Sequence, residues 1–130
     1  MRMLAAVAFG GALGSMARWT LAGWVQGRTA AARGAAALFP AGTLVVNMTG
    51  CLLIGVLATL FEERLAGDPA LRTFVLAGLL GGFTTFSSFG LETFHLLREG
   101  NLALAFANTA GSVVLGLAAV WLGAALARAI

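Results

Sequence analysis

The sequence predicts an all-α integral membrane protein with four transmembrane helices, the third of them broken near its middle. Three observations lead to this prediction. Of the 130 residues, 60% are hydrophobic and only 10% are charged, a balance far outside that of soluble domains. Uncharged runs recur four times, each near the ~20 residues that a helix needs to cross the hydrocarbon core. A cluster of glycine and hydroxyl residues interrupts the third run.

The four expected spans form one domain that covers residues 1–130. The first span is interrupted only by Arg18, and Pro40 stands at the entry to the second. Asp68 and Pro69 are typical of a turn before the third span. Because both prolines lie outside the expected helix interiors, a break in the third span must come from glycine and hydroxyl residues. The spans are expected at residues 3–25, 42–61, 71–97 and 102–127.

The arginines that flank the spans are divided almost equally between the two sides of the membrane. Four spans place both termini on one side, and an excess of Lys and Arg normally marks the cytoplasmic side. Two interpretations stay open: a single, weakly determined topology, or insertion in both orientations followed by antiparallel pairing. One side carries Arg2, Arg64, Arg72 and Arg128, and the other carries Arg28, Arg33 and Arg98.

The third span contains the most informative segment of the chain, Gly81-Gly82-Phe83-Thr84-Thr85-Phe86-Ser87-Ser88-Phe89. Adjacent glycines weaken a helix, and four hydroxyl side chains give up apolar contact. Non-helical backbone at membrane depth survives only where protein buries it or where it lines a hydrated path. The segment therefore predicts a helix break at a functional site.

Short ladders of polar side chains lie on three of the spans at helical spacing. Each ladder taken alone is explained by interhelical hydrogen bonds, worth about 0.6–2 kcal/mol per contact. Three ladders together with a glycine break favour a hydrated pathway. The ladders are Thr43 with Asn47 on the second span, Thr84 with Ser87 and Thr85 with Ser88 and Glu92 on the third, and Asn108 with Ser112 on the fourth.

The chemistry of these side chains favours an anion as the transported species. Hydroxyl and carboxamide groups donate hydrogen bonds to anions, whereas cation paths more typically carry acidic rings. Arg18 is the only cation that lies away from the ends of the predicted spans, and its alternative role is to snorkel to the interface. Four helices leave little room for a central path, so that a path at a subunit interface is expected.

Phenylalanine recurs every three residues along one side of the third span, at Phe83, Phe86 and Phe89. Contact with lipid or with the core is the ordinary explanation. The edge of an aromatic ring is electropositive, however. Ring edges at a narrow constriction would stabilise a small anion without binding it as tightly as a fixed charge would.

At this point three motifs resemble those of the CrcB/Fluc family of fluoride channels, and the match extends over nearly the whole chain. The third motif is highly specific, whereas the first alone would be weak. They are Gly10-Gly11-x-x-Gly14 followed by Arg18-Trp19, then Gly42-Thr43-Leu44-x-Val46-Asn47-x-x-Gly50, and then the Gly81–Phe89 segment with Glu92.

The resemblance implies a passive fluoride channel of the cell inner membrane, not an enzyme, built as an antiparallel homodimer with two interfacial pores. It also implies a structural sodium ion held by the main-chain carbonyls of Gly81 and Thr84. The expected partners are fluoride, the lipid bilayer and a second copy of the chain. No basic stripe for nucleic acid is present. The residues that match the family's pore are Thr43, Asn47, Phe86, Ser87, Ser88, Phe89, Asn108 and Ser112, with Arg18 and Glu92 at the pore mouths.

Two positions depart from the family pattern. Ser88 stands where threonine is frequent and keeps the hydroxyl, and Asn108 stands where tyrosine is common. An amide still donates a hydrogen bond, but the chemistry of that pore position differs.

Two other functions are weighed against the channel. A proton-coupled exporter similar to the small multidrug-resistance transporters would rely on a carboxylate in the first span, where this chain has Arg18 and no acid. In a non-conducting assembly subunit, every polar residue would serve only to form hydrogen bonds between packed helices. Flux measurements separate both from a fluoride channel.

Overall fold

All regular structure in the computed structural model, which describes residues 1–32, 34–64 and 67–130, is helical. The predicted all-α class is confirmed for these ranges. The elements in chain order are α1 (Arg2–Ala30), α2 (Ala35–Leu38), α3 (Ala41–Glu63), α4 (Pro69–Arg72), the π-helical η1 (Thr73–Leu80), α5 (Gly81–Phe83), α6 (Phe86–Arg98) and α7 (Leu102–Ala129).

Three helical stretches are long and apolar enough to cross a membrane, within the described residues. They are Ala41–Glu63, Pro69–Arg98 and Leu102–Ala129, and they make the chain a multi-pass membrane protein. The first predicted span forms one helix, α1, of 29 residues. Its glycine, serine and arginine residues lower its hydropathy, and α1 is not among the three. A count of four spans therefore stays a prediction.

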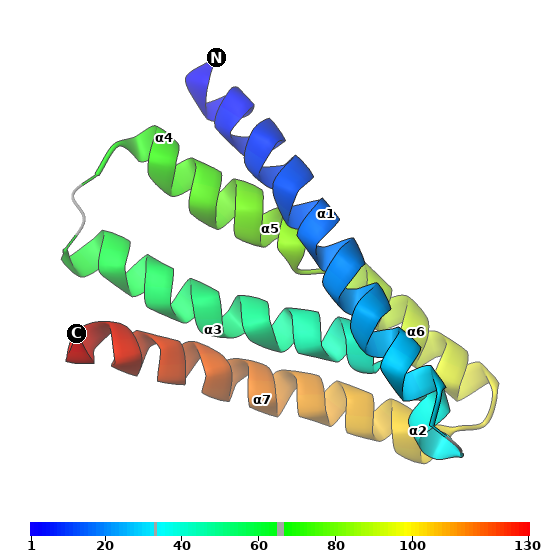
Figure 1. Cartoon of the computed structure of the whole chain (residues 1–130). Helices are drawn as coiled ribbons and strands as arrows, with labels where there is room; N and C mark the ends of the chain where they lie inside the picture. The colour runs from blue at the N-terminus through cyan, green and yellow to red at the C-terminus, as the bar shows by residue number, and fades with distance from the viewer. Residues whose placement is uncertain (33, 65–66) are drawn as a thin grey trace.

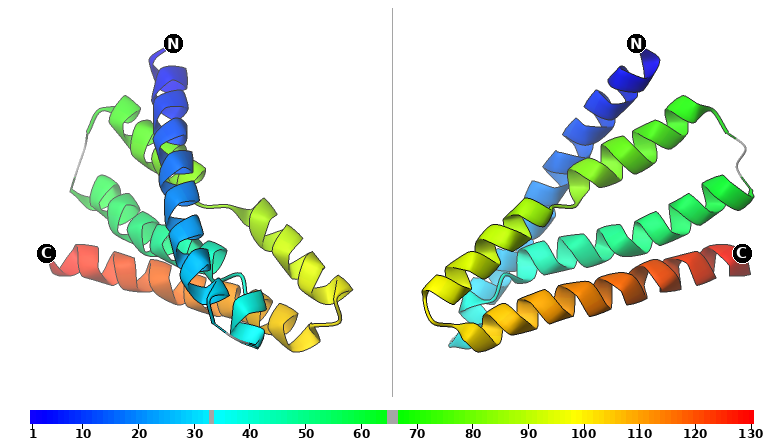
Figure 2. Two further views of the ribbon diagram at one scale, coloured as in Figure 1. Left: turned by 45° about the vertical axis from the view of Figure 1, so that its right-hand side comes forward. Right: turned by 180° about the vertical axis from the view of Figure 1, so that it is seen from behind.

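The helices form an open, splayed bundle (Figure 1). Helices α3 and α7 run parallel to each other, both starting at the end of the molecule where α2 lies, and make the most extensive contact in the molecule, while α1 crosses α3 and packs on η1 and α5. Both termini lie at the same end of the molecule as the start of α4, and α2 and the start of α7 lie at the opposite end. The α6 helix turns away from α5 and contacts α7 near the start of α7 (Figure 2).

Glycine permits the closest of these contacts. A Cβ atom added at Gly123 of α7 would collide with the Leu52 carbonyl oxygen of α3, and one added at Gly55 would collide with the Val120 carbonyl oxygen. A Cβ at Gly14 of α1 would likewise collide with the carbonyl oxygen of Leu79. Small residues let the backbones of membrane helices approach closely. Because lipid provides no hydrophobic driving force between helices, the dispersion and interhelical contacts made at this short distance stabilise their association.

The chain connections follow the expected proline chemistry. Helix α3 begins directly after Pro40, and α4 begins at Pro69, where the Asp68 side chain accepts a hydrogen bond of 2.9 Å from the Ala70 N–H. Of the arginines expected outside the membrane, Arg33 lies outside the described residues. Two form exposed ion pairs, Arg72 with Glu62 at 3.7 Å and Arg128 with Glu63 at 2.9 Å.

Candidate functional site

The helical stretch that begins at Pro69 is interrupted at Thr84 and Thr85 (Figure 2). Helix α5 ends at Phe83, both threonines have extended backbone dihedrals, and α6 begins at Phe86. Thr85 is buried, so its main-chain groups need partners. A buried peptide group without a hydrogen bond costs about 1–3 kcal/mol.

Asn47 of α3 supplies those partners. Its Oδ1 accepts a hydrogen bond of 2.9 Å from the Thr85 N–H, and its Nδ2 donates one of 3.1 Å to the Thr85 carbonyl. One side chain thus satisfies both main-chain groups of the extended residue. Asn47 was predicted as a pore residue; the geometry adds that it holds the break in place, and its amide nitrogen carries a second N–H.

The Thr85 side chain restarts the helix. Its Oγ1 accepts a hydrogen bond of 3.2 Å from the Ser88 N–H, as the N-cap of α6. The same oxygen donates to Ser88 Oγ at 3.1 Å and lies 3.2 Å from Ser87 Oγ. A threonine cap of this kind is worth about 1 kcal/mol. The three hydroxyl groups therefore form one connected cluster at the start of α6.

Among the main-chain carbonyls that the break frees are those of Gly81 and Thr84. In a continuous α-helix the Gly81 carbonyl would accept from the Thr85 N–H, and the Thr84 carbonyl from the Ser88 N–H. Here Asn47 and the Thr85 side chain take those two N–H groups. Within the described part of the chain, neither carbonyl accepts another main-chain hydrogen bond. Unwound carbonyls of this kind are suitable ligands for Na⁺.

A cavity of about 370 Å³ lies on one side of the break. The Phe86 and Phe89 rings form part of its wall, with centroids 5.4 Å apart and planes tilted by 41°. Ser112 of α7 contributes a buried Oγ that has no hydrogen-bond partner within the described residues. The predicted site residues that line this cavity are Asn47, Gly81, Thr84, Phe86, Phe89 and Ser112.

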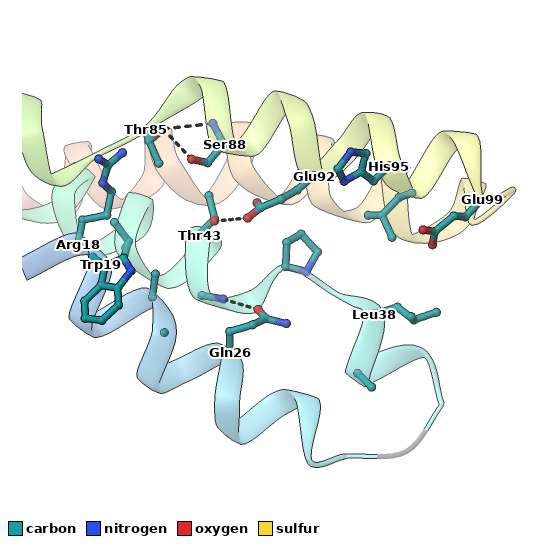
Figure 3. A pocket seen from close by; sticks show the side chains of 17 residues that line it. Arg18, Trp19, Gln26, Leu38, Thr43, Thr85, Ser88, Glu92, His95 and Glu99 are labelled. Atoms are coloured by element: carbon teal, nitrogen blue, oxygen red, sulfur yellow. Dashed lines mark hydrogen bonds between the residues drawn. The ribbon is translucent and has the colours of Figure 1, made fainter. Parts of the chain in front are cut away.

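A second cavity, of about 700 Å³, lies on the other side of Thr85, which lines both (Figure 3). Thr43 donates a hydrogen bond of 2.6 Å to Glu92 Oε1, and the buried Glu92 Oε2 has no partner among the described residues. Arg18 and Trp19 line the α1 side of this cavity. The predicted residues that line it are Arg18, Thr43, Ser88 and Glu92.

Comparison with known proteins identifies the family of this chain. Residues 5–124 match the family described as "CrcB-like protein, Camphor Resistance (CrcB)". The chain belongs to the CrcB family. It is 49% identical over 122 residues to a protein of Solibacter usitatus, a match that covers 94% of this chain and 95% of the relative. That relative is named "Fluoride-specific ion channel FluC".

Two further relatives carry the same name. A protein of Methylobacillus flagellatus is 48% identical over 94% of this chain and 91% of its own length. A protein of Stutzerimonas stutzeri is 46% identical over 98% of each chain. The resemblance to the CrcB family that the three sequence motifs indicated is thus confirmed over nearly the whole chain.

Two predicted pore residues of this CrcB-family chain line neither cavity. Ser87 is exposed and bonds only within the hydroxyl cluster. Asn108 of α7 is 2% exposed, and its Nδ2 donates a hydrogen bond of 2.9 Å to Thr93 Oγ1. Thr93 in turn donates to the Phe89 carbonyl at 2.7 Å. Asn108 therefore reaches the Phe89 backbone through Thr93, and its role as a pore-lining group stays a prediction.

The expectation that Phe83 shares one side of a helix with Phe86 and Phe89 is wrong. It assumed a continuous helix, but Phe83 is the last residue of α5 and is buried, whereas Phe86 is the first residue of α6 and is 84% exposed. The expected pairing of Thr84 with Ser87 fails for the same reason, because Thr84 Oγ1 donates to the Leu80 carbonyl instead.

Proposed function

We propose that this chain forms a passive, fluoride-selective ion channel of the cell inner membrane, in which two copies of four spanning helices pair antiparallel and enclose two pores. The relatives named as fluoride-specific channels support the transported ion. The observation that carries the proposal is the cavity that combines the Asn47 amide and the Ser112 hydroxyl with the Phe86 and Phe89 rings. It offers donors and electropositive ring edges, and none of the described residues that line it is a fixed cation.

The proposed path joins the two cavities at Thr85. An anion would enter the larger cavity, where Arg18 attracts it, and pass the Thr43 and Ser88 hydroxyls. Beyond the hydroxyl cluster it would meet Asn47 and then the unpartnered Ser112 hydroxyl. Neutral donors bind a small anion weakly enough for it to leave again, as conduction requires. Transport needs no chemical step, so the protein is not proposed as an enzyme.

A second copy would complete the pore wall at the phenylalanines. Phe86 is 84% exposed on a single chain although it lines the smaller cavity. A ring at a constriction needs protein on its other side, because a lipid-exposed polar path would leave its donors unsatisfied. Nearly equal arginine numbers on the two sides support insertion in both orientations. In this arrangement α1 would be the fourth spanning helix.

The freed carbonyls of Gly81 and Thr84 support a proposed structural sodium ion at the break. Gly81 and Thr84 would hold it through oxygen atoms that accept no main-chain hydrogen bond within the described residues. When bound, the ion would supply a fixed positive charge and tie the unwound backbone of the two copies together. The chain's own contribution is the pair of side chains, Asn47 and Thr85, that withhold the competing N–H groups.

The alternative of a proton-coupled exporter receives no support. Helix α1 carries no acidic residue, and the relatives carry a channel name. Pore residues also lie at a helix break and not around a carboxylate of the first helix.

The test is fluoride efflux from liposomes that contain the purified protein. A potassium ionophore carries the compensating positive charge, and an electrode measures the released fluoride. Phe86→Ile removes an aromatic edge from the proposed constriction, so efflux should fall at least ~10-fold, which corresponds to about 1.4 kcal/mol. Phe94→Ile is the matched control, because Phe94 is an exposed ring on the same helix that lines neither cavity. Full flux in Phe86→Ile would overturn the proposal.

A further inference from the structure

The first turn of α3 lacks a cap from its own segment. The residue before the helix is Pro40, which has no side-chain acceptor, and the first N–H groups of any helix lack intrahelical partners. A helix start that lies against protein needs another source of acceptors. Gly42, the second residue of α3, is buried, so its N–H is one that water reaches poorly.

Gln26 of α1 provides that acceptor from 16 positions earlier in the chain (Figure 3). Its Oε1 accepts a hydrogen bond of 3.2 Å from the Gly42 N–H. Its Nε2 donates one of 3.3 Å to the Phe39 carbonyl, on the other side of Pro40. The carboxamide therefore bridges both sides of the entry to α3, which a shorter or apolar side chain would not do.

Close backbone contact fixes the same junction. A Cβ atom at Gly42 would collide with the carbonyl oxygen of Ala22, so α3 begins directly against α1. Ala22 lies four residues before Gln26 and therefore on the same face of α1. Contact at Ala22 sets the distance between the two helices, and the Gln26 bridge sets the orientation of the first turn.

The first two turns of α3 carry two predicted pore residues, Thr43 and Asn47. Thr43 follows Gly42 directly, is buried, and donates to Glu92 of α6 at 2.6 Å. Asn47 lies one turn further along α3 and holds the extended Thr85. Arg18, Gln26, Thr43 and Glu92 all line the larger cavity. A rotation of the first turn of α3 would therefore move Thr43 away from Glu92 and disturb the anchor of the break.

We propose that Gln26 is a positioning residue of the channel: it caps α3 from a different helix and thereby holds Thr43 in register with Glu92. This inference rests on the proposed fluoride channel. Gln26 acts through the α3 backbone and not by contact with the transported ion. A local acceptor that caps the same N–H should therefore replace it.

The experiment is a cycle of three variants. Gln26→Met keeps the length of the side chain and loses both hydrogen bonds. Pro40→Ser alone is the background control, and in Gln26→Met/Pro40→Ser the new hydroxyl stands at the N-cap, where it accepts from the N2 or N3 N–H, Gly42 being N2. Thr20→Val is the matched control, because Thr20 is an exposed residue of α1 whose hydroxyl bonds only to its own helix, at Met16.

Two readouts are taken on the dimer reconstituted in lipid: hydrogen exchange at the Gly42 amide, and fluoride efflux per dimer. In Gln26→Met both should change about fivefold, the effect of losing one helix cap, with faster exchange and slower efflux. The double variant should recover both, and Thr20→Val should change neither. Unchanged exchange and efflux in Gln26→Met would overturn the inference, as would an efflux defect that Pro40→Ser fails to repair.

Failure of the proposed function gives a different result. Absence of fluoride efflux in the parent protein would refute the channel and the positioning role with it. Exchange at Gly42 would still report whether Gln26 caps α3. If the parent protein conducts fluoride, the exchange and efflux results of the Gln26 variants decide the positioning role alone and leave the proposed channel intact.

Discussion

The α3–α7 pair and the junction between α5 and α6 satisfy the same backbone requirement in opposite ways. In α3 and α7 the helices are continuous, the main-chain hydrogen bonds of the helix interiors stay within each helix, and glycine brings the backbones together. At the junction, two residues leave the helix, and side chains of Asn47 and Thr85 take over the lost main-chain bonds. The interior of a regular helix leaves no carbonyl free, whereas the junction frees several, among them those of Gly81 and Thr84. Irregular backbone is thus the means by which an apolar bundle exposes polar groups.

The largest effect is expected where the regular pair is broken. Gly123→Ala places a Cβ against the Leu52 carbonyl, and because a backbone atom cannot move aside cheaply, the cost should be about 3 kcal/mol or more. Thermal unfolding in detergent, followed by circular dichroism, should show a large loss of stability. Gly111→Ala on the same helix is the control, since a Cβ there meets no described atom within 4 Å. Equal stability of the two variants would contradict the backbone-contact account.

The next largest effect is expected at the junction. Asn47→Leu removes both hydrogen bonds of the buried Thr85 main chain, which should cost about 2–4 kcal/mol and abolish fluoride efflux. Asn47→Asp keeps an acceptor for the Thr85 N–H but loses the donor to the carbonyl. Its stability and efflux should therefore lie between those of the parent protein and those of Asn47→Leu. Efflux and unfolding are measured on the same preparations. A stable Asn47→Leu protein with parental efflux would show that the junction does not need this side chain.

A smaller effect is expected for the link between the two regions, the bond from Asn108 on α7 to Thr93 on α6. Asn108→Leu should lower the free energy of unfolding by about 1–3 kcal/mol, because Asn108 is fully buried and Thr93 loses its donor. Thr93→Val should have a similar effect, and the double variant should cost less than the sum of the two. Additive losses, or loss of efflux without loss of stability, would instead favour a pore-lining role for Asn108.

The smallest effect is expected at the ends of the regular pair. Arg128 and Glu63 join α7 to α3 by a contact of 2.9 Å, but both side chains are more than a third exposed. Water and salt screen such a pair, so Glu63→Gln should change stability by less than ~1 kcal/mol and leave efflux unchanged. Unfolding at low and at high salt measures this. A loss comparable to that of Gly123→Ala would mean that the pair of helices is held by charge and not by backbone contact.

Hydropathy alone predicted the bounds of the long helices to within a few residues. The expected spans 42–61 and 102–127 correspond to Ala41–Glu63 and Leu102–Ala129, because charged residues and proline mark the ends of apolar runs. The Gly81–Phe89 segment was found in the same way, from residue types that suit no membrane helix. The grouping of the phenylalanines was wrong, since helical spacing has no meaning across the extended Thr84 and Thr85.

The partners of the polar residues could not be predicted from spacing. The bonds from Asn47 to Thr85 and from Thr43 to Glu92 depend on how two helices cross, and a period of 3.6 residues describes one helix only. Gln26 and Thr93 were missed for the same reason. One signal was present for Gln26: Pro40 at the start of α3 has no side-chain acceptor, so that an acceptor from elsewhere was required.

The central claim is that the junction and its two cavities form a path for fluoride. The most direct test compares fluoride and chloride efflux from the same liposomes containing the parent protein, with equal gradients and the membrane potential clamped by an ionophore. The account predicts rapid fluoride efflux and chloride efflux indistinguishable from that of protein-free liposomes. Equal efflux of both ions, or of neither, would contradict it.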